Sequence, residues 1–203
     1  MTNQTQRPQL EAPGAGISRT EMLLLNKVLK RFLIKNSGVT EAVSFLKKSK
    51  AEILAAVEVV DKSKLTEKVL VARPWFVEDS SRNWSVAMLC RHLAIVDSSL
   101  ARAIESGRVV SSVGLPEPSK RVAAVKPEEE KNQASVIDEF SDAVVSLAAA
   151  ADKHKPADLK VRTIPHPWLG EISHLQWIWF AGYHHRVHLK QLQAIVRGLK
   201  WKN

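Results

Sequence analysis

Hydrophobic residues recur with a helical period along most of the chain, and strand-like alternation is rare. The longest such segment begins after Ser173 and runs to about Leu199, and similar patterns cover residues 40–61, 83–106 and 126–153. Each pattern places an apolar stripe on one side and charged residues on the other, as in an amphipathic helix. Four long amphipathic segments predict an all-α protein built as a helical bundle.

A further helix is predicted before these four. Residues 18–35 carry leucine-rich pairs at helical spacing, with Ser18 or Thr20 as the N-cap and residues 36–38 as the stop. Residues 1–17 are polar and rich in Pro, Gly and Gln, which predicts a flexible N-terminal tail. The expected organisation is therefore a tail at 1–17 and one helical-bundle domain at 18–203.

Capping residues and prolines set the expected limits of the bundle helices. Thr40 is the predicted cap of the second helix, and Ser81 or Asn83 that of the next. Pro127 and three glutamates suit the start of the helix at 126–153, after a linker with Gly and Pro. Residues 70–76 read as a loop over one end of the bundle, and residues 163–173 as an extended segment that ends at Ser173, the cap of the last helix.

Two histidines lie one turn apart in the last helix. With an advance of about 100° per residue, His184 and His188 fall in the middle of the apolar stripe, together with Trp177 and Phe180. Because side chains at i and i+4 stack on one face, two such imidazoles can bind one divalent ion. His185 projects about 100° away from His184 and is expected at the flank of the stripe.

A third histidine faces the core from another helix. The same projection places His92 on the apolar side of its helix, whereas Cys90 points the opposite way and Asp97 points elsewhere. Buried imidazole nitrogens need partners, and each unsatisfied one costs about 1–3 kcal/mol. A divalent metal would satisfy all three histidines at once, although each one alone is more simply explained as a hydrogen-bonded core residue.

Composition narrows the classes of function. The formal charge is +9 with a pI near 9.8, but the basic residues are scattered, without a recognition-helix or finger motif. This distribution favours a solvated basic surface, and we do not expect nucleic-acid binding. A single cysteine fits a cytoplasmic location, and neither a secretion signal nor an 18-residue apolar run is found.

Three motifs resemble the DinB-like (DNA-damage-inducible) metalloprotein superfamily of four-helix bundles, which includes thiol-dependent S-transferases and isomerases. The stretch from Trp84 to Leu93 looks like the family's second helix with its first ligand. His184-x-x-x-His188-x-x-Gln191 matches the paired ligands followed by glutamine. His166-Pro-Trp-Leu-Gly resembles the loop of one subgroup before the last helix. The resemblance covers residues 40–196, so the helix at 18–35 lies outside it.

The resemblance implies a site for a divalent metal ion, zinc or nickel, held by His92, His184 and His188. Three protein ligands leave a position open for water or substrate. It implies a metal-dependent enzyme that activates a thiol or water, for transfer to or hydrolysis of a small molecule, with a low-molecular-weight thiol as one partner. The alternative is a non-catalytic metal-binding bundle that acts as an interaction or stress-response protein. The family's habit of pairing bundles suggests a homodimer.

Two other polar residues are candidates for the chemistry. Gln191 lies one turn beyond His188, where it could bond a ligand imidazole or bound water, or equally a neighbouring helix. His166 could act as an acid or base at the open end of the site, or could be a loop histidine held between two prolines.

The remaining aromatic and histidine residues are less informative. Four tryptophans could line the mouth of the site or belong to the core: Trp75, Trp84, Trp168 and Trp177. His154 and His174 lie near helix ends and are expected to be exposed to solvent.

Overall fold

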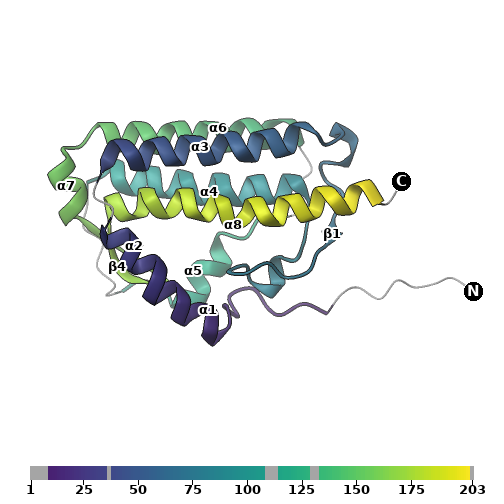
Figure 1. The fold of residues 1–203 in the computed structure, drawn as a ribbon, viewed down its shortest axis with the longest axis horizontal. Helices are drawn as coiled ribbons and strands as arrows, with labels where there is room; N and C mark the ends of the chain where they lie inside the picture. Colours follow the sequence, from purple (N-terminus) through teal and green to yellow (C-terminus); the bar gives the residue numbers. More distant parts are fainter. Residues whose placement is uncertain (1–8, 36–37, 108–113, 129–132, 202–203) are drawn as a thin grey trace, which may run out of the picture.

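Four long helices form the body of the molecule in the computed structural model, which describes residues 9–35, 38–107, 114–128 and 133–201 (Figure 1). They are α3 (Val39–Glu58), α4 (Val86–Glu105), α6 (Gln133–Asp152) and α8 (His174–Trp201). The predicted all-α bundle is therefore confirmed. Among the described residues, no helix is both long and apolar enough to cross a membrane.

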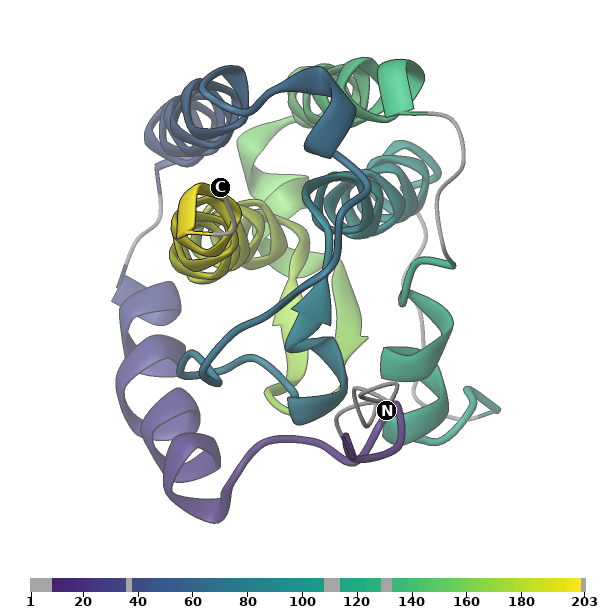
Figure 2. The same cartoon turned by 90° about the vertical axis from the view of Figure 1, so that its right-hand side faces the viewer.

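The four helices pack in two pairs around one apolar core. α4 packs most extensively on α6, and α3 on α8, and Figure 2 shows the four helices nearly end-on. Large side chains from every helix of the bundle are completely buried, among them Leu46, Leu89, Phe140 and Ile178. Burial of each such side chain contributes about 1.5–3 kcal/mol, so the core fixes the relative positions of α4 and α8.

The extra N-terminal helix exists and lies across one side of the bundle, near α8 (Figure 1). It consists of α1 (Arg19–Leu24), a π-helical turn η1 (Leu25–Leu29) and α2 (Lys30–Lys35). Ser18 and Glu21 form a capping box, in which each side chain accepts a hydrogen bond from the other's backbone N–H. The predicted Ser18 cap is thus confirmed.

Residues 9–17 approach the loop between the two strands that precede α4. The backbone N–H groups of Gly14 and Gly16 donate to the carboxylate of Glu78, at 3.2 and 2.8 Å. Residues 1–8 lie outside the described residues, and the division into a flexible tail at 1–17 and one domain at 18–203 stays a prediction.

Two short antiparallel strand pairs lie in the segments that connect the bundle helices. β1 (Val69–Leu70) pairs with β2 (Asn83–Trp84), and β3 (Thr163–His166) pairs with β4 (Gly170–Ser173), both antiparallel. Two short 3₁₀ turns are η2 (Lys62–Lys64) and η3 (Asp79–Ser81). The extended segment expected at 163–173 is the β3–β4 hairpin, and Gly170 takes a positive φ of 70° directly after its turn. Ser173 caps α8 as predicted, because its Oγ accepts from the N–H of Gln176.

Two predicted caps are wrong. α3 begins at Val39 after the extended residue Gly38, so Thr40 is already inside the first turn. α4 is capped by Ser85, whose Oγ accepts from the N–H of Met88. Asn83 cannot serve because it pairs within β2, and the helix starts only after that strand ends.

The predicted start of the helix at 126–153 is also wrong, and two short helices that begin at prolines were not predicted. α6 begins at Gln133 and not near Lys126, since residues 126–128 are not helical. Two short helices were not predicted, α5 (Pro118–Ala124) and α7 (Pro156–Val161). Each begins with a proline, which has no N–H to lose at the first helical position, so a residue expected to break helices starts one here.

Candidate metal centre

Three imidazoles converge between α4 and α8. His92 comes from α4, and His184 and His188 come from successive turns of α8. Nε2 of His184 lies 3.2 Å from Nε2 of His92 and 3.1 Å from Nε2 of His188. Their candidate ligand atoms all lie within 4.8 Å of one another. The structure therefore brings together the three histidines that the sequence singled out.

Hydrogen bonds fix the tautomers of two of these histidines. Nδ1 of His92 lies 2.8 Å from the carbonyl oxygen of Val125, and Nδ1 of His188 lies 2.8 Å from Oε1 of Gln191. Both partners are acceptors, so each Nδ1 carries the proton and donates. The Nε2 atoms of His92 and His188 then present lone pairs toward His184.

The short Nε2 contacts fit a bound cation better than hydrogen bonds. Nε2 of His184 can carry one proton at most, which would satisfy one of its two neighbours and leave the other lone pair facing it. Two nitrogen ligands of a tetrahedral zinc ion are ~3.3 Å apart when each Zn–N bond is about 2.0–2.1 Å. The observed separations of 3.2 and 3.1 Å are close to that value. The donor set present is thus suited to a divalent transition metal.

Burial keeps the three histidines neutral, which is the form that binds a metal. Desolvation lowers the pKa of His92 to about 4, although the hydrogen bond to Val125 opposes this shift. The pKa values of His184 and His188 lie well below the usual range, because burial and the neighbouring histidines both disfavour the charged form. Near neutral pH the Nε2 lone pairs of His92 and His188 are therefore available, and the His184 ring is neutral.

Gln191 is completely buried and holds His188 in place. Its Oε1 accepts from Nδ1 of His188, and its Nε2 donates to the carbonyl oxygen of Ser81 at 2.7 Å. The expected contact to a histidine of the cluster is therefore present, whereas the second contact goes to the η3 turn and not to a neighbouring helix of the bundle. A hydrogen bond to the second nitrogen of a ligand histidine fixes its tautomer and orientation.

The three histidines form part of the wall of a cavity of about 420 Å³. Most of its other lining is apolar or aromatic, and Trp84 stacks nearly parallel to His188, with ring centroids 6.0 Å apart. Trp168 and Trp177 also line the cavity, as the sequence suggested. Trp75 does not line it and is 60% exposed, because it lies in the loop after β1. A cavity of this size suits a small organic molecule.

The β3–β4 hairpin places His166 in the wall of the same cavity. Nδ1 of His166 accepts from the backbone N–H groups of Trp168 and Leu169, at 3.0 and 3.1 Å. The ring proton therefore sits on Nε2. Burial, assisted by the nearby Arg121 cation, lowers the pKa of His166 to about 3. These contacts favour a neutral hydrogen-bond donor over the acid or base considered from the sequence.

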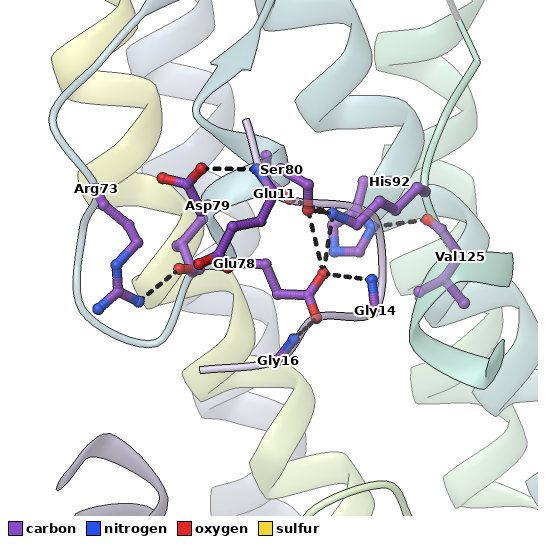
Figure 3. A network of polar contacts seen from close by, with 12 residues as sticks. Glu11, Gly14, Gly16, Arg73, Glu78, Asp79, Ser80, His92 and Val125 are labelled. Atoms are coloured by element: carbon purple, nitrogen blue, oxygen red, sulfur yellow. Dashed lines mark hydrogen bonds and ion pairs between the residues drawn. The ribbon is translucent and has the colours of Figure 1, made fainter. Parts of the chain in front are cut away.

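An ion pair borders the cavity on the side of the N-terminal segment. Lys126 Nζ lies 2.9 Å from Oε2 of Glu78. The same carboxylate accepts from the N–H of Gly14 through Oε2 and from the N–H of Gly16 through Oε1 (Figure 3). Burial alone raises the pKa of Glu78, but Lys126 and the backbone donors outweigh it and lower the pKa overall. Glu78 is thus an ionised carboxylate whose acceptor capacity is already used.

His185 was predicted at the flank of the apolar stripe of α8, but it is completely buried. Its Nε2 lies 2.8 Å from Oδ2 of Asp97 on α4, and its Nδ1 lies 2.9 Å from Oγ of Ser49 on α3. Asp97 is also completely buried, although its helix projected it away from the core. Both ring nitrogens of His185 therefore have partners on two other helices, which the pattern of one helix cannot show, whereas Oδ1 of Asp97 is buried without a hydrogen-bond partner.

His154 and His174, which lie near helix ends and were expected to be exposed, differ in burial. His174 is completely buried, contrary to the exposure expected for it, because the chain before α8 folds back over the first turn and its N–H donates to the carbonyl of Arg162. His154 is half-buried at the end of α6. Cys90 is buried and free, and burial raises the pKa of its thiol to about 12, so it offers no thiolate to a metal.

Known proteins share this architecture. A family model of the DinB superfamily matches residues 45–192. The four-helix bundle protein TT2238 is 27% identical, with a TM-score of 0.52 over 77% of this chain and 98% of its own. YfiT from Bacillus subtilis, described as a probable metal-dependent hydrolase, is 18% identical, with a TM-score of 0.56 over 80% of this chain and 88% of its own.

A mycothiol-dependent maleylpyruvate isomerase also has this fold. It is 13% identical, with a TM-score of 0.56 over 78% of this chain and 62% of its own. At 13% and 18% identity, the isomerase and YfiT establish the fold alone. A search of curated proteins found no match.

Proposed function

This chain belongs to the DinB superfamily, and we propose that it is a metal-dependent enzyme that acts on a small molecule. The observation that carries the proposal is the convergence of three Nε2 atoms in the wall of a 420 Å³ cavity, with that of His184 lying 3.2 Å from that of His92 and 3.1 Å from that of His188. A purely structural site would be enclosed by four protein ligands, whereas three ligands beside a cavity leave room for a reactant.

We assign the ligands as His92, His184 and His188, and the ion as zinc or nickel. Neutral imidazoles suit both of these metals. The carbonyl of Val125 and the amide of Gln191 hold two of the rings with Nε2 turned toward the ion. Their role is to fix the ligand geometry before substrate arrives.

When bound, the ion would lower the pKa of a thiol or water near it toward neutrality. The chain's own residues provide the surroundings for this chemistry. Trp84, Trp177 and Phe180 contribute to the mostly apolar lining of the cavity, so charges that develop there are less screened than in bulk water. His166 directs an Nε2–H donor from the cavity wall, where it can orient a polar group of the substrate.

The descriptions of two proteins with this fold support a thiol and water, respectively, as the group that the metal activates. One is described as mycothiol-dependent and the other as a probable metal-dependent hydrolase. We therefore propose transfer of a low-molecular-weight thiol, or hydrolysis, as the reaction class. The homodimer and the cytoplasmic location stay predictions.

The test is the metal content of the purified, tag-free protein by elemental analysis. We expect about one zinc or nickel ion per chain, lost in His92→Ala, His184→Ala and His188→Ala, and retained in the control His154→Ala. Loaded protein is then assayed with thiol-transfer and hydrolytic substrates. If the chain binds no metal even after reconstitution, and the variants fold normally, the metal-dependent enzyme is excluded and a bundle that acts only through its interactions is left.

A further inference from the structure

Arg121 brings to the cavity a positive charge that no described carboxylate neutralises. It lies in α5 and lines the same cavity as the three histidines. One Nη1–H donates to the carbonyl oxygen of Pro165 at 2.9 Å, which anchors the guanidinium against the β3–β4 hairpin. Its Nε is buried and has no hydrogen-bond partner. A buried donor without a partner costs about 1–3 kcal/mol, so this group is suited to a ligand.

His166 adds a second donor beside Arg121. It follows Pro165, which accepts the hydrogen bond from Arg121, and it lines the same cavity. Because its Nδ1 accepts two backbone N–H groups, its Nε2 carries the proton. The ring contacts Phe180 and Trp177, with centroids 4.4 and 4.9 Å away, so its orientation is fixed by packing.

The charges around the cavity favour an anion. Glu78 is the one carboxylate among the described lining residues, and it is already bound by Lys126 and by two glycine N–H groups. This pair is close to neutral as a whole, so the cation of Arg121 remains uncompensated. Arg121 is half-buried beside a mostly apolar cavity, so its charge is less screened there than on an open surface.

We propose that Arg121 and His166 form a carboxylate-binding subsite, and that the substrate is a small carboxylate with an apolar body. The guanidinium presents a planar fork of donors that matches a carboxylate, and His166 supplies one further N–H. Phe180 connects this subsite to the three histidines, since its ring centroid lies 4.4 Å from that of His166 and 5.8 Å from that of His184. The inference deepens the proposed function by naming its substrate class, but the binding itself does not need the metal.

The test uses trans-cinnamate and hexanoate, each compared with its uncharged amide. Binding to the full chain is measured by calorimetry and by quenching of tryptophan fluorescence, which reports on the cavity because three tryptophans line it. Metal-free protein is measured first, so that the probe cannot bind a metal. We expect the carboxylates to bind about tenfold more tightly than the amides, as a hydrogen-bonded charge pair of this kind provides.

Three variants assign the preference to a residue. Arg121→Gln should remove it, and Arg121→Lys should keep part of it, because the charge remains and the planar fork is lost. Arg197→Gln removes the same charge from an exposed position on the opposite face of α8, and should keep the preference in full. Thermal melts followed by circular dichroism show whether each variant folds. If Arg121→Gln does not fold, Arg121→Lys tests the proposal in its place.

Other outcomes would overturn the subsite. One is a preference for carboxylates that survives in Arg121→Gln, and another is a preference that exists only in zinc-loaded protein, which would place the carboxylate on the metal. Absence of binding by both carboxylates at millimolar concentration would also exclude this substrate class. If the chain binds no metal but shows the Arg121-dependent preference, the carboxylate subsite is supported and the metal-dependent enzyme is excluded. Failure of the proposed function can therefore be distinguished from failure of the subsite.

Discussion

Gln191 joins His188 to the loop before α4, because one amide group bonds both. Its Oε1 accepts from Nδ1 of His188 at 2.8 Å, and its Nε2 donates to the carbonyl of Ser81 at 2.7 Å. The position of the imidazole therefore depends on a segment that is more than a hundred residues away along the chain. Any metal held by His188 should depend on this amide as well.

We expect Gln191→Leu to weaken zinc binding by about 10–100-fold, the range measured when the partner of a ligand histidine is removed. The affinity is measured by competition with a chromogenic chelator. Gln191→Glu keeps an acceptor for His188 and should lose less affinity than Gln191→Leu. Equal affinities in the wild type and in Gln191→Leu would show that this hydrogen bond does not orient a ligand.

The buried contact between His185 and Asp97 should stabilise the fold and not the metal site. Both side chains are completely buried, and Asp97 Oδ2 lies 2.8 Å from His185 Nε2. Removal of one member leaves the other buried without its partner, which costs about 3–5 kcal/mol. Asp97→Ala should lose unfolding free energy of this order in urea titrations.

Metal content distinguishes this role from a catalytic one. Asp97→Ala should retain the zinc stoichiometry of the wild type under conditions where it is folded. Asp138→Ala, on the exposed side of α6, serves as the control and should change the unfolding free energy little. Loss of zinc from folded Asp97→Ala would show that the buried pair also supports the ligands.

The sequence predicted the parts of the molecule that follow from one helix at a time. The apolar periods of α4 and α8 place His92, His184 and His188 on inward faces, and packing of the two helices then brings them together. The role of His185 was missed because its partners come from α3 and α4. Arg121 was missed because the helix that carries it begins at Pro118, in a segment that was interpreted as a linker. Contacts between distant segments have no periodic signal in the sequence.

Glu21 should make the stability of the protein depend on pH in the acid range. Burial raises the pKa of Glu21, but hydrogen bonds from Arg73, Phe76 and Ser18 outweigh this and lower it from 4.5 to about 2. A lowered pKa in the folded state means that the contribution is complete above the unfolded value of 4.5. It is lost as the pH falls toward about 2.

We therefore expect Glu21→Gln to lower the unfolding free energy by about 1–3 kcal/mol at pH 7. The difference from the wild type should shrink between pH 4.5 and about 2. Urea titrations at several pH values measure both quantities. Glu58→Gln, at an exposed position on α3, is the control and should show no such convergence. A difference that stays constant down to pH 2 would mean that the charge of Glu21 does not matter.

Gly182 lets α8 approach α3 closely, one half-turn before His184. A Cβ at this position would lie 2.5 Å from Cδ1 of Phe45, whose ring is confined by Trp179 and Tyr183, with centroids 5.6 and 5.0 Å away. Alanine has the better helix propensity by about 1 kcal/mol, but a clash in a packed core costs about 1–3 kcal/mol. We expect Gly182→Ala to destabilise the fold and to weaken zinc binding, because α8 must move away from α3.

Gly198→Ala separates the two effects. Its Cβ would meet Val69 Cγ1 near the far end of α8, so it should cost stability and leave the zinc affinity unchanged. Adding Phe45→Ala to Gly182→Ala removes the obstructing ring and should restore zinc affinity, since α8 can then keep its position. If Gly182→Ala binds zinc as tightly as the wild type, the close approach of α8 to α3 does not position His184, and the ligand geometry depends on α4 and Gln191 alone.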